Sequence, residues 1–160
     1  MNPAPSIIFF TVASGAGYGL LFWLGLLRPL GYVPQTAGFY VLAGGLALVL
    51  TMLGLLSSTA HLGRPERAWR ALSQWRTSWL SREGICAVAT FIPAGLFFLA
   101  LPGETEWLAG PAGLLSAAGA AVTVFCTGMI YASLPTIRQW HHPLVAPGYM
   151  LFGAFSGAVL

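Results

Sequence analysis

Long apolar stretches dominate the chain, and short polar segments separate them. A membrane-spanning helix needs about 20 mostly apolar residues, and four stretches reach that length, over residues 5–27, 36–60, 83–101 and 108–134. A proline or a charged residue stands at most of their boundaries, where helices end. A fifth apolar run, over residues 144–160, is short for a span. The pattern predicts an all-α polytopic transmembrane helix bundle of four spans and a truncated fifth.

The segment between the second and third spans has a different pattern. Pro65 suits a first helical position and Glu66 a first turn. At about 100° per residue, the residues Ala68, Trp69, Leu72 and Trp75 share one side, and the residues Arg67, Arg70 and Gln74 lie opposite. We therefore expect an amphipathic helix that lies along the membrane interface.

Composition supports a membrane protein, since 57% of the residues are hydrophobic and only 7% are charged. The charged residues are seven Arg and four Glu, without Lys or Asp, so the net charge of +3 does not indicate a nucleic-acid partner. If the spans alternate, six of the seven Arg lie on one side of the membrane. The positive-inside rule then places the N-terminus and the loop between His61 and Glu83 in the cytoplasm.

Small residues and cysteines have structural interpretations. The sequence SGAGYG, residues 14–19, lies inside an apolar span, so it does not fit a phosphate-binding loop, which follows a strand. Gly15 and Gly19 instead form a small-xxx-small pair for close helix contact, and Gly153 and Gly157 suit the same role. Cys86 and Cys126 are too few for a disulfide framework or a zinc site, and we interpret them as packing residues.

His61 and Glu83 are the candidate chemical groups. They enter from neighbouring spans at one membrane face, and ionisable groups within a membrane are functional candidates. Imidazole titrates near neutral pH, and a carboxylate can pass a second proton to water. This pair suits the oxidation of a quinol, whose two hydroxyls lose protons as electrons leave. A purely structural role, with Glu83 paired to His61, Arg64 or Arg82, is the alternative.

The electrons need an acceptor, which the sequence does not supply. Iron–sulfur clusters take four thiolates, and the chain has two Cys. A haem-bearing cytochrome b-like subunit is a further alternative, in which two of His61, His141 and His142 would bind the haem. We expect no haem or iron–sulfur cluster in this chain, and a first electron acceptor in a partner subunit.

The sequences HLGRPERAWRA, residues 61–71, and SWLSREG, residues 78–84, resemble the membrane-anchor subunit of dimethyl sulfoxide reductase, within the NrfD-like group of quinol-interacting anchors. The resemblance extends to NPAPSIIFFTVASGAGYG, residues 2–19, and IYASLPTIRQWHHP, residues 130–143. The chain also looks like the anchors of sulfite-oxidising relatives. Electrons would there run from sulfite to quinone, instead of from quinol to sulfoxide.

The resemblance implies a site, cofactors and partners. His61 and Glu83 match family positions implicated in quinol binding and proton transfer, and Gly63 and Arg64 belong to the same motif; we add Arg82, Trp69 and Arg67 as supporting residues. Menaquinone or ubiquinone would bind as substrate. An iron–sulfur subunit and a molybdenum catalytic subunit would bind the anchor in the bacterial cytoplasmic membrane. Family members resemble one another in having about eight spans, so we expect residues 1–160 to form one membrane domain, the N-terminal part of such an anchor.

Overall fold

The computed structural model describes residues 5–59, 65–100 and 106–160, and the side chains of residues 65–68 and 71 are not described. The described part of the chain is helical throughout and contains no strand. The elements in chain order are α1 (Pro5–Leu27), α2 (Ala37–Thr59), the 3₁₀ helix η1 (Pro65–Gln74), α3 (Trp79–Leu99), the 3₁₀ helix η2 (Glu106–Leu108), α4 (Ala109–Ala132) and α5 (Val145–Val159).

Four of these helical segments are long and apolar enough to cross a membrane: α1, α2, α3, and η2 together with α4. They confirm the four spans expected from the apolar pattern. The predicted start of the third span was wrong, because α3 begins at Trp79 rather than at Glu83. Ser78 caps this helix by accepting a hydrogen bond from the backbone N–H of Ser81 at 3.4 Å. Glu83 therefore lies within the helix and not at its mouth.

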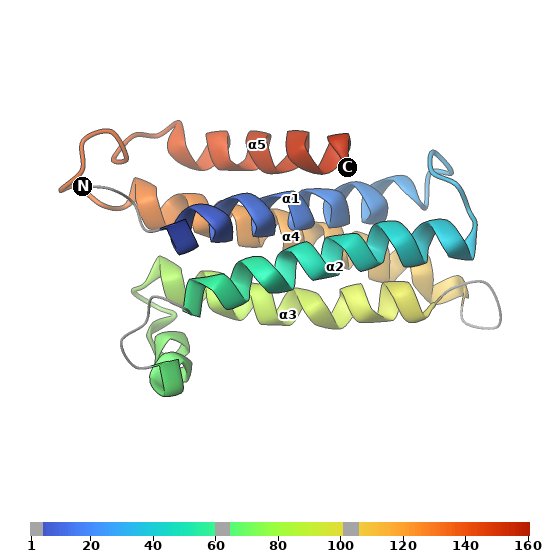
Figure 1. Cartoon of the computed structure of the whole chain (residues 1–160), viewed down its shortest axis with the longest axis horizontal. Helices are drawn as coiled ribbons and strands as arrows, with labels where there is room; N and C mark the ends of the chain where they lie inside the picture. The colour runs from blue at the N-terminus through green and yellow to red at the C-terminus, as the bar shows by residue number, and fades with distance from the viewer. Residues whose placement is uncertain (1–4, 60–64, 101–105) are drawn as a thin grey trace.

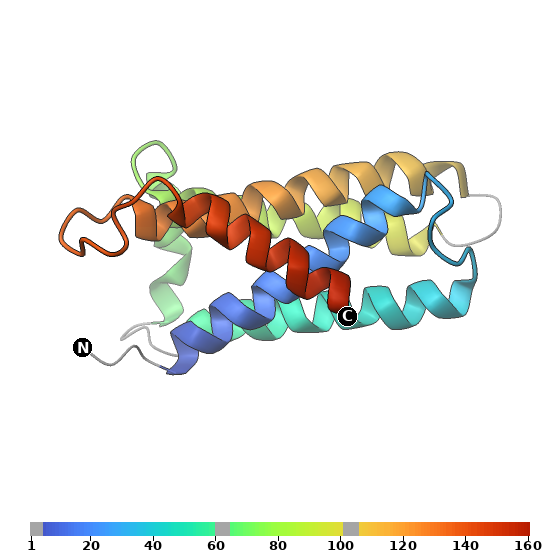
Figure 2. The same cartoon turned by 90° about the horizontal axis from the view of Figure 1, so that it is seen from above.

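The long helices form an up-and-down bundle, as Figure 1 shows. α3 packs along α4, α1 packs against both α2 and α4, and α2 touches α3 only weakly. α5 crosses α1 obliquely, which Figure 2 shows from above, and it also contacts α4. The connection after α1 and the segment η1 lie at opposite ends of the bundle (Figure 1).

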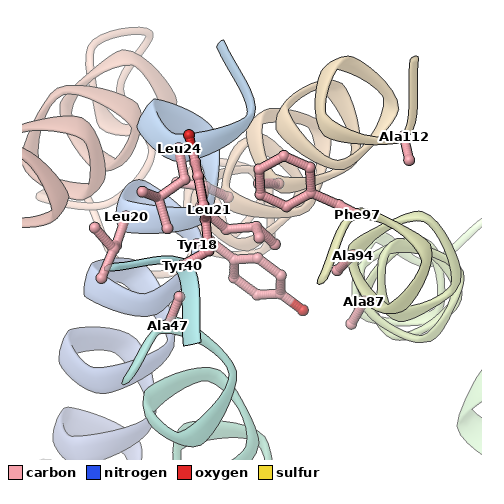
Figure 3. Close-up of a cluster of buried hydrophobic side chains, with 12 residues drawn as sticks. Tyr18, Leu20, Leu21, Leu24, Tyr40, Ala47, Ala87, Ala94, Phe97 and Ala112 are labelled. Atoms are coloured by element: carbon pink, nitrogen blue, oxygen red, sulfur yellow. The ribbon is translucent and has the colours of Figure 1, made fainter. Parts of the chain in front are cut away.

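The core of the bundle combines a few aromatic rings with many small residues. Tyr18, Tyr40 and Phe97 are almost completely buried, and Ala94 and Ala120 are fully buried beside them. Figure 3 shows most of this cluster between α1, α2 and α3. Small side chains let helix backbones approach closely, which is how helices associate when lipid is as apolar as the core. Large apolar side chains such as Leu42 accordingly lie on the outside.

Gly19 and Gly157 bring α5 onto α1, which confirms their predicted role in close helix contact. A Cβ atom on Gly19 would overlap the carbonyl oxygen of Gly153, and one on Gly157 would overlap the backbone of Gly19. The prediction is not confirmed for Gly15, because a Cβ built on it would meet no atom within 4 Å; only its carbonyl oxygen lies near Gly153. The indole Nε1 of Trp23 donates a hydrogen bond to Ala154 O at 2.8 Å across the same contact.

Candidate functional site

Among the described residues, Glu83 carries a buried carboxylate, and only 4% of its surface is exposed. Its Oε1 accepts a hydrogen bond from Thr127 Oγ1 at 2.5 Å, which joins α3 to α4. A buried carboxylate is costly unless hydrogen bonds or charges compensate it. The Glu83 side chain therefore depends on Thr127, a residue 44 positions away in the sequence.

Thr127 belongs to a set of buried hydroxyls between α3 and α4. Its Oγ1 also lies 3.1 Å from Thr123 O, and Thr123 Oγ1 lies 3.5 Å from Thr90 Oγ1. Ser116, Thr123 and Thr127 are all buried on α4. Their spacings of seven and four residues place them on one face of a helix. This polar stripe in the fourth span is visible in the sequence, yet none of its residues was among the predicted site residues.

Three tyrosines on other helices lie within electrostatic range of Glu83, and they too were absent from the predicted site. Tyr18 of α1, Tyr131 of α4 and Tyr149 of α5 lie close enough to the Glu83 carboxylate to interact with its charge. The rings of Tyr131 and Tyr149 stack with centroids 5.3 Å apart. The Tyr18 hydroxyl is buried near Thr123 but has no hydrogen-bond partner among the described residues. Glu83 thus lies between α3 and α4, within electrostatic range of tyrosines on α1 and α5.

A cavity of about 350 Å³ borders this site between α1, α4 and α5. Tyr18, Thr127 and Tyr149 line it, together with Ser14 and apolar residues of α5. Ligand sites are typically cavities of about 300–1,000 Å³ with a few polar groups in a mostly apolar wall. The cavity has the size and the polarity of a site for a small amphipathic molecule.

The structure describes some of the predicted site residues but not others. His61, Gly63 and Arg64 lie outside the described residues, and so does the side chain of Arg67. Arg82 does not turn toward Glu83. Its guanidinium donates hydrogen bonds to Trp75 O at 2.9 Å and Arg76 O at 2.8 Å, and it lies 4.3 Å from the centre of the Trp79 ring. Arg82 therefore fixes the connection before α3.

Trp69 lies on η1 and is 66% exposed. η1 is a 3₁₀ helix, not the α-helix assumed from 100° per residue. At three residues per turn, Trp69 and Leu72 lie on the same side of η1, as expected. Gln74, however, does not lie on the same side as Arg70, which was expected of it. Leu72 packs against α3, since a Cβ on Gly84 would meet its Cδ2 at 2.7 Å.

The two cysteines and the described histidines lie near this end of the bundle. Cys86 of α3 and Cys126 of α4 are both free thiols. His141 Nδ1 lies 2.8 Å from Ala132 O, and His142 Nδ1 accepts a hydrogen bond from Leu144 N at 3.2 Å. These contacts fix the exposed connection between α4 and α5. The described residues contain no cluster of His, Cys, Asp and Glu that could hold a metal ion.

The helix bundle and its buried polar site define a polytopic helical membrane protein with a carboxylate held at one end. The whole chain, residues 1–160, matches the family described as DMSO reductase anchor subunit (DmsC). The chain belongs to this family, and its described part contains four helices that are long and apolar enough to cross a membrane.

Two curated relatives support this assignment. The chain is similar to the C subunit of sulfite dehydrogenase from Allochromatium vinosum, with 39% identity over 178 aligned positions that cover 100% of this chain and 54% of the relative. It is also similar to the anaerobic dimethyl sulfoxide reductase chain YnfH of Escherichia coli K12, with 30% identity over 114 positions that cover 70% of this chain and 40% of that protein. The chain spans about half the length of these curated relatives. No solved structure matches the chain.

Proposed function

We propose that this chain exchanges electrons and protons between a membrane quinone and an iron–sulfur partner subunit, with Glu83 and His61 handling the protons. The observation that carries this proposal is the environment of Glu83. A carboxylate with 4% exposure and one side-chain hydrogen bond is costly to bury. Such a group within a membrane protein is a functional candidate. Thr127, its hydrogen-bond partner, lines a cavity that suits an amphipathic ring.

The residues of this chain suit the redox chemistry of a quinol. A quinol releases two protons as its two electrons leave, so a site needs proton acceptors near the ring. Glu83 can accept one of these protons and the imidazole of His61 the other. The molybdenum cofactor and the iron–sulfur clusters would belong to partner subunits. The substrate converted there, a sulfoxide or sulfite, follows from the partners and not from this chain.

Binding of a quinone analogue to the assembled complex tests the proposal. The probe is a fluorescent heptyl hydroxyquinoline N-oxide, whose emission is quenched on binding. We expect Glu83→Gln and His61→Ala to weaken its binding by about tenfold or more, which corresponds to about 1.4 kcal/mol. Glu106→Gln is the matched control, because Glu106 is an exposed carboxylate at the other end of the bundle. Wild-type binding by both site variants would contradict the proposal.

We further propose that the partner subunits dock at the η1 end, on the cytoplasmic side of the membrane. Arg70 and Arg76 are exposed there, with their guanidinium groups 5.6 and 5.5 Å from the rings of Trp69 and Trp75. Arginine and tryptophan are enriched in protein interfaces, where they contribute much of the binding energy. An Arg70→Glu, Arg76→Glu double variant should lower co-purification of the iron–sulfur subunit. Unchanged co-purification would place the docking surface elsewhere.

A further inference from the structure

The cavity beside Glu83 changes in character from its buried to its exposed side. Its buried wall carries hydroxyl groups, from Ser14, Tyr18 and Thr127, whose exposed fractions are 4%, 3% and 7%. Its outer wall carries the apolar side chains of Val12, Phe152 and Phe155, which are 65%, 77% and 71% exposed. A molecule that fits this gradient has a polar ring at one end and an apolar tail at the other.

The buried hydroxyls differ in the hydrogen bonds that they can offer a ligand. Ser14 Oγ donates its proton to Phe10 O at 2.6 Å, so it can only accept from a ligand. The Tyr18 hydroxyl has no hydrogen-bond partner within the described part of the chain, although a buried hydroxyl without a hydrogen bond is costly. Tyr18 can therefore offer both a donor and an acceptor to a bound molecule.

Thr127 connects the cavity to Glu83. It lines the cavity, and its hydroxyl is within hydrogen-bonding distance of both Glu83 Oε1, at 2.5 Å, and Thr123 O, at 3.1 Å. A threonine hydroxyl carries a single proton and can also accept hydrogen bonds. It can therefore donate to only one of these two oxygens at a time, and its oxygen can accept from the cavity side.

We infer that the cavity between α1, α4 and α5 binds the quinone ring, with its isoprenoid tail toward Val12 and Phe155, and that Thr127 relays a proton between the ring and Glu83. This inference rests on the proposed function and adds the location of the ring and the route of one proton. Glu83 itself then need not touch the quinone.

The relay accounts for one of the two protons of a quinol. The O–H bond of one ring hydroxyl breaks as its proton passes to Thr127 Oγ1, and the Thr127 proton passes to Glu83 Oε1, where a new O–H bond forms. The protonated carboxyl then donates to Thr127, whose hydroxyl turns to Thr123 O. The second proton passes to His61 and the two electrons to the iron–sulfur partner. Quinone reduction reverses each step.

A side chain added at Gly15 tests where the ring binds. Gly15 lines the cavity, and a Cβ built on it has no atom within 4 Å, so Gly15→Leu should fill the cavity without disturbing the helices. Gly45→Leu is the matched control, because its Cβ is equally unobstructed and Gly45 lies on α2, away from the cavity. In the assembled complex, Gly15→Leu should weaken binding of the hydroxyquinoline N-oxide by about tenfold or more, and Gly45→Leu should leave it unchanged. Wild-type affinity in Gly15→Leu would overturn the location.

Substitutions of Thr127 test the relay. Thr127→Val keeps the shape of the side chain and removes its hydroxyl, whereas Thr127→Ser keeps the hydroxyl. We expect Thr127→Val to lower kcat for quinol oxidation by about tenfold or more, with KM within about threefold of wild type. Thr127→Ser should keep kcat near its wild-type value. A merely structural role would instead lower the yield of assembled complex and leave kcat per complex unchanged, which would overturn the relay.

The two proposals fail in different ways. If Glu83→Gln and His61→Ala lose analogue binding while Gly15→Leu and Thr127→Val behave like wild type, the quinone binds near Glu83 but outside this cavity. The inference is then wrong and the proposed function stands. If all four variants bind the analogue and turn over normally, both are wrong.

Discussion

Two charged side chains are buried at opposite ends of the bundle, and their surroundings differ. Arg28, directly after α1, is 7% exposed, and Glu83, near the start of α3, is 4% exposed. Figure 1 shows these two helix ends on opposite sides. Among the contacts of the described residues, neither side chain meets an opposite charge.

Arg28 is held by the core itself. Its guanidinium lies 4.3 Å from the centre of the Tyr40 ring and 5.2 Å from that of Phe97, and Nη2 donates to Ala100 O at 3.5 Å. The charge of a guanidinium is delocalised and weakly hydrated, so aromatic faces can replace water around it. These contacts, with aromatic rings and a backbone carbonyl, are those of a structural residue.

Glu83 has neighbours of a different kind from those of Arg28. A carboxylate has only acceptors and needs donors when it is buried, yet the Thr127 hydroxyl is the one side-chain donor that reaches it among the described residues. Tyrosines lie within electrostatic range of it, and Thr127 also lines a cavity. Arg28 is also incompletely compensated, because its Nη1 has no hydrogen-bond partner among the described residues. The comparison shows that neither burial nor an unsatisfied hydrogen-bonding group marks a functional charge by itself; Glu83 differs because its partner Thr127 lines a cavity.

The largest expected effect comes from removing the Glu83 charge. Glu83→Gln should lower quinol-linked turnover of the assembled complex by about 100-fold. The free energy of unfolding should be unchanged or higher, because an amide costs less to bury than a carboxylate. Turnover assays and thermal unfolding of the same preparation check both parts. A large loss of stability with normal turnover would make Glu83 a structural residue like Arg28.

A methyl group at Gly19 should loosen the Glu83 end selectively. Gly19→Ala forces α5 away from α1, and such overpacking costs about 1–3 kcal/mol. Because α5 forms one wall of the cavity, analogue binding should fall with stability. Gly45→Ala is the control, since its added Cβ meets nothing within 4 Å and Gly45 lies on α2, away from the cavity. Equal unfolding temperatures of the two variants would contradict the close contact of α1 with α5.

Replacing Arg28 should affect stability alone. Arg28→Met keeps an unbranched side chain and removes the interaction of the guanidinium with Tyr40 and Phe97, which we expect to cost about 2 kcal/mol. Turnover per assembled complex should stay at the wild-type level. Thermal unfolding measures the first effect and turnover the second. A drop in turnover without a drop in stability would show that the Arg28 end also takes part in function.

The smallest effect is expected at Arg82. Arg82→Gln removes two hydrogen bonds to the carbonyls of Trp75 and Arg76 from a partly exposed side chain. The loss of stability should stay at or below about 1 kcal/mol, and analogue binding should not change, because Arg82 points away from Glu83. A tenfold loss of analogue affinity would instead support a direct role for Arg82 in the quinone site.

Much of the fold could be predicted from hydropathy. Apolar runs of span length gave α1, α2 and α4 to within a few residues, because a membrane-spanning helix must hide its backbone from lipid. The start of α3 was missed because its first turn, from Trp79 to Arg82, is mixed in polarity. Ser78, as the N-cap, was the signal for that helix start.

The site was predictable only in part. Glu83 stands out in the sequence as an ionisable residue in an apolar region. Its neighbours Tyr18, Thr127 and Tyr149 come from three other helices, and the periodicity of one helix does not say which faces meet. The contact of α1 with α5, which brings Tyr149 into place, depends on glycines whose role as packing residues was clear but whose partners were not.

Because η1 has three residues per turn, a change in the length of this connection can rotate the side chains that follow it. Trp69 and Leu72 share a row because they are one turn apart, and Leu72 packs against Gly84, next to Glu83. Deleting one residue between Trp69 and Leu72 would rotate the following residues by about 120° and bring a different side chain against α3. Removing or inserting three residues would keep the rows aligned. Length changes in this loop should therefore be tolerated among relatives in steps of three, a periodicity that a comparison of family members can test.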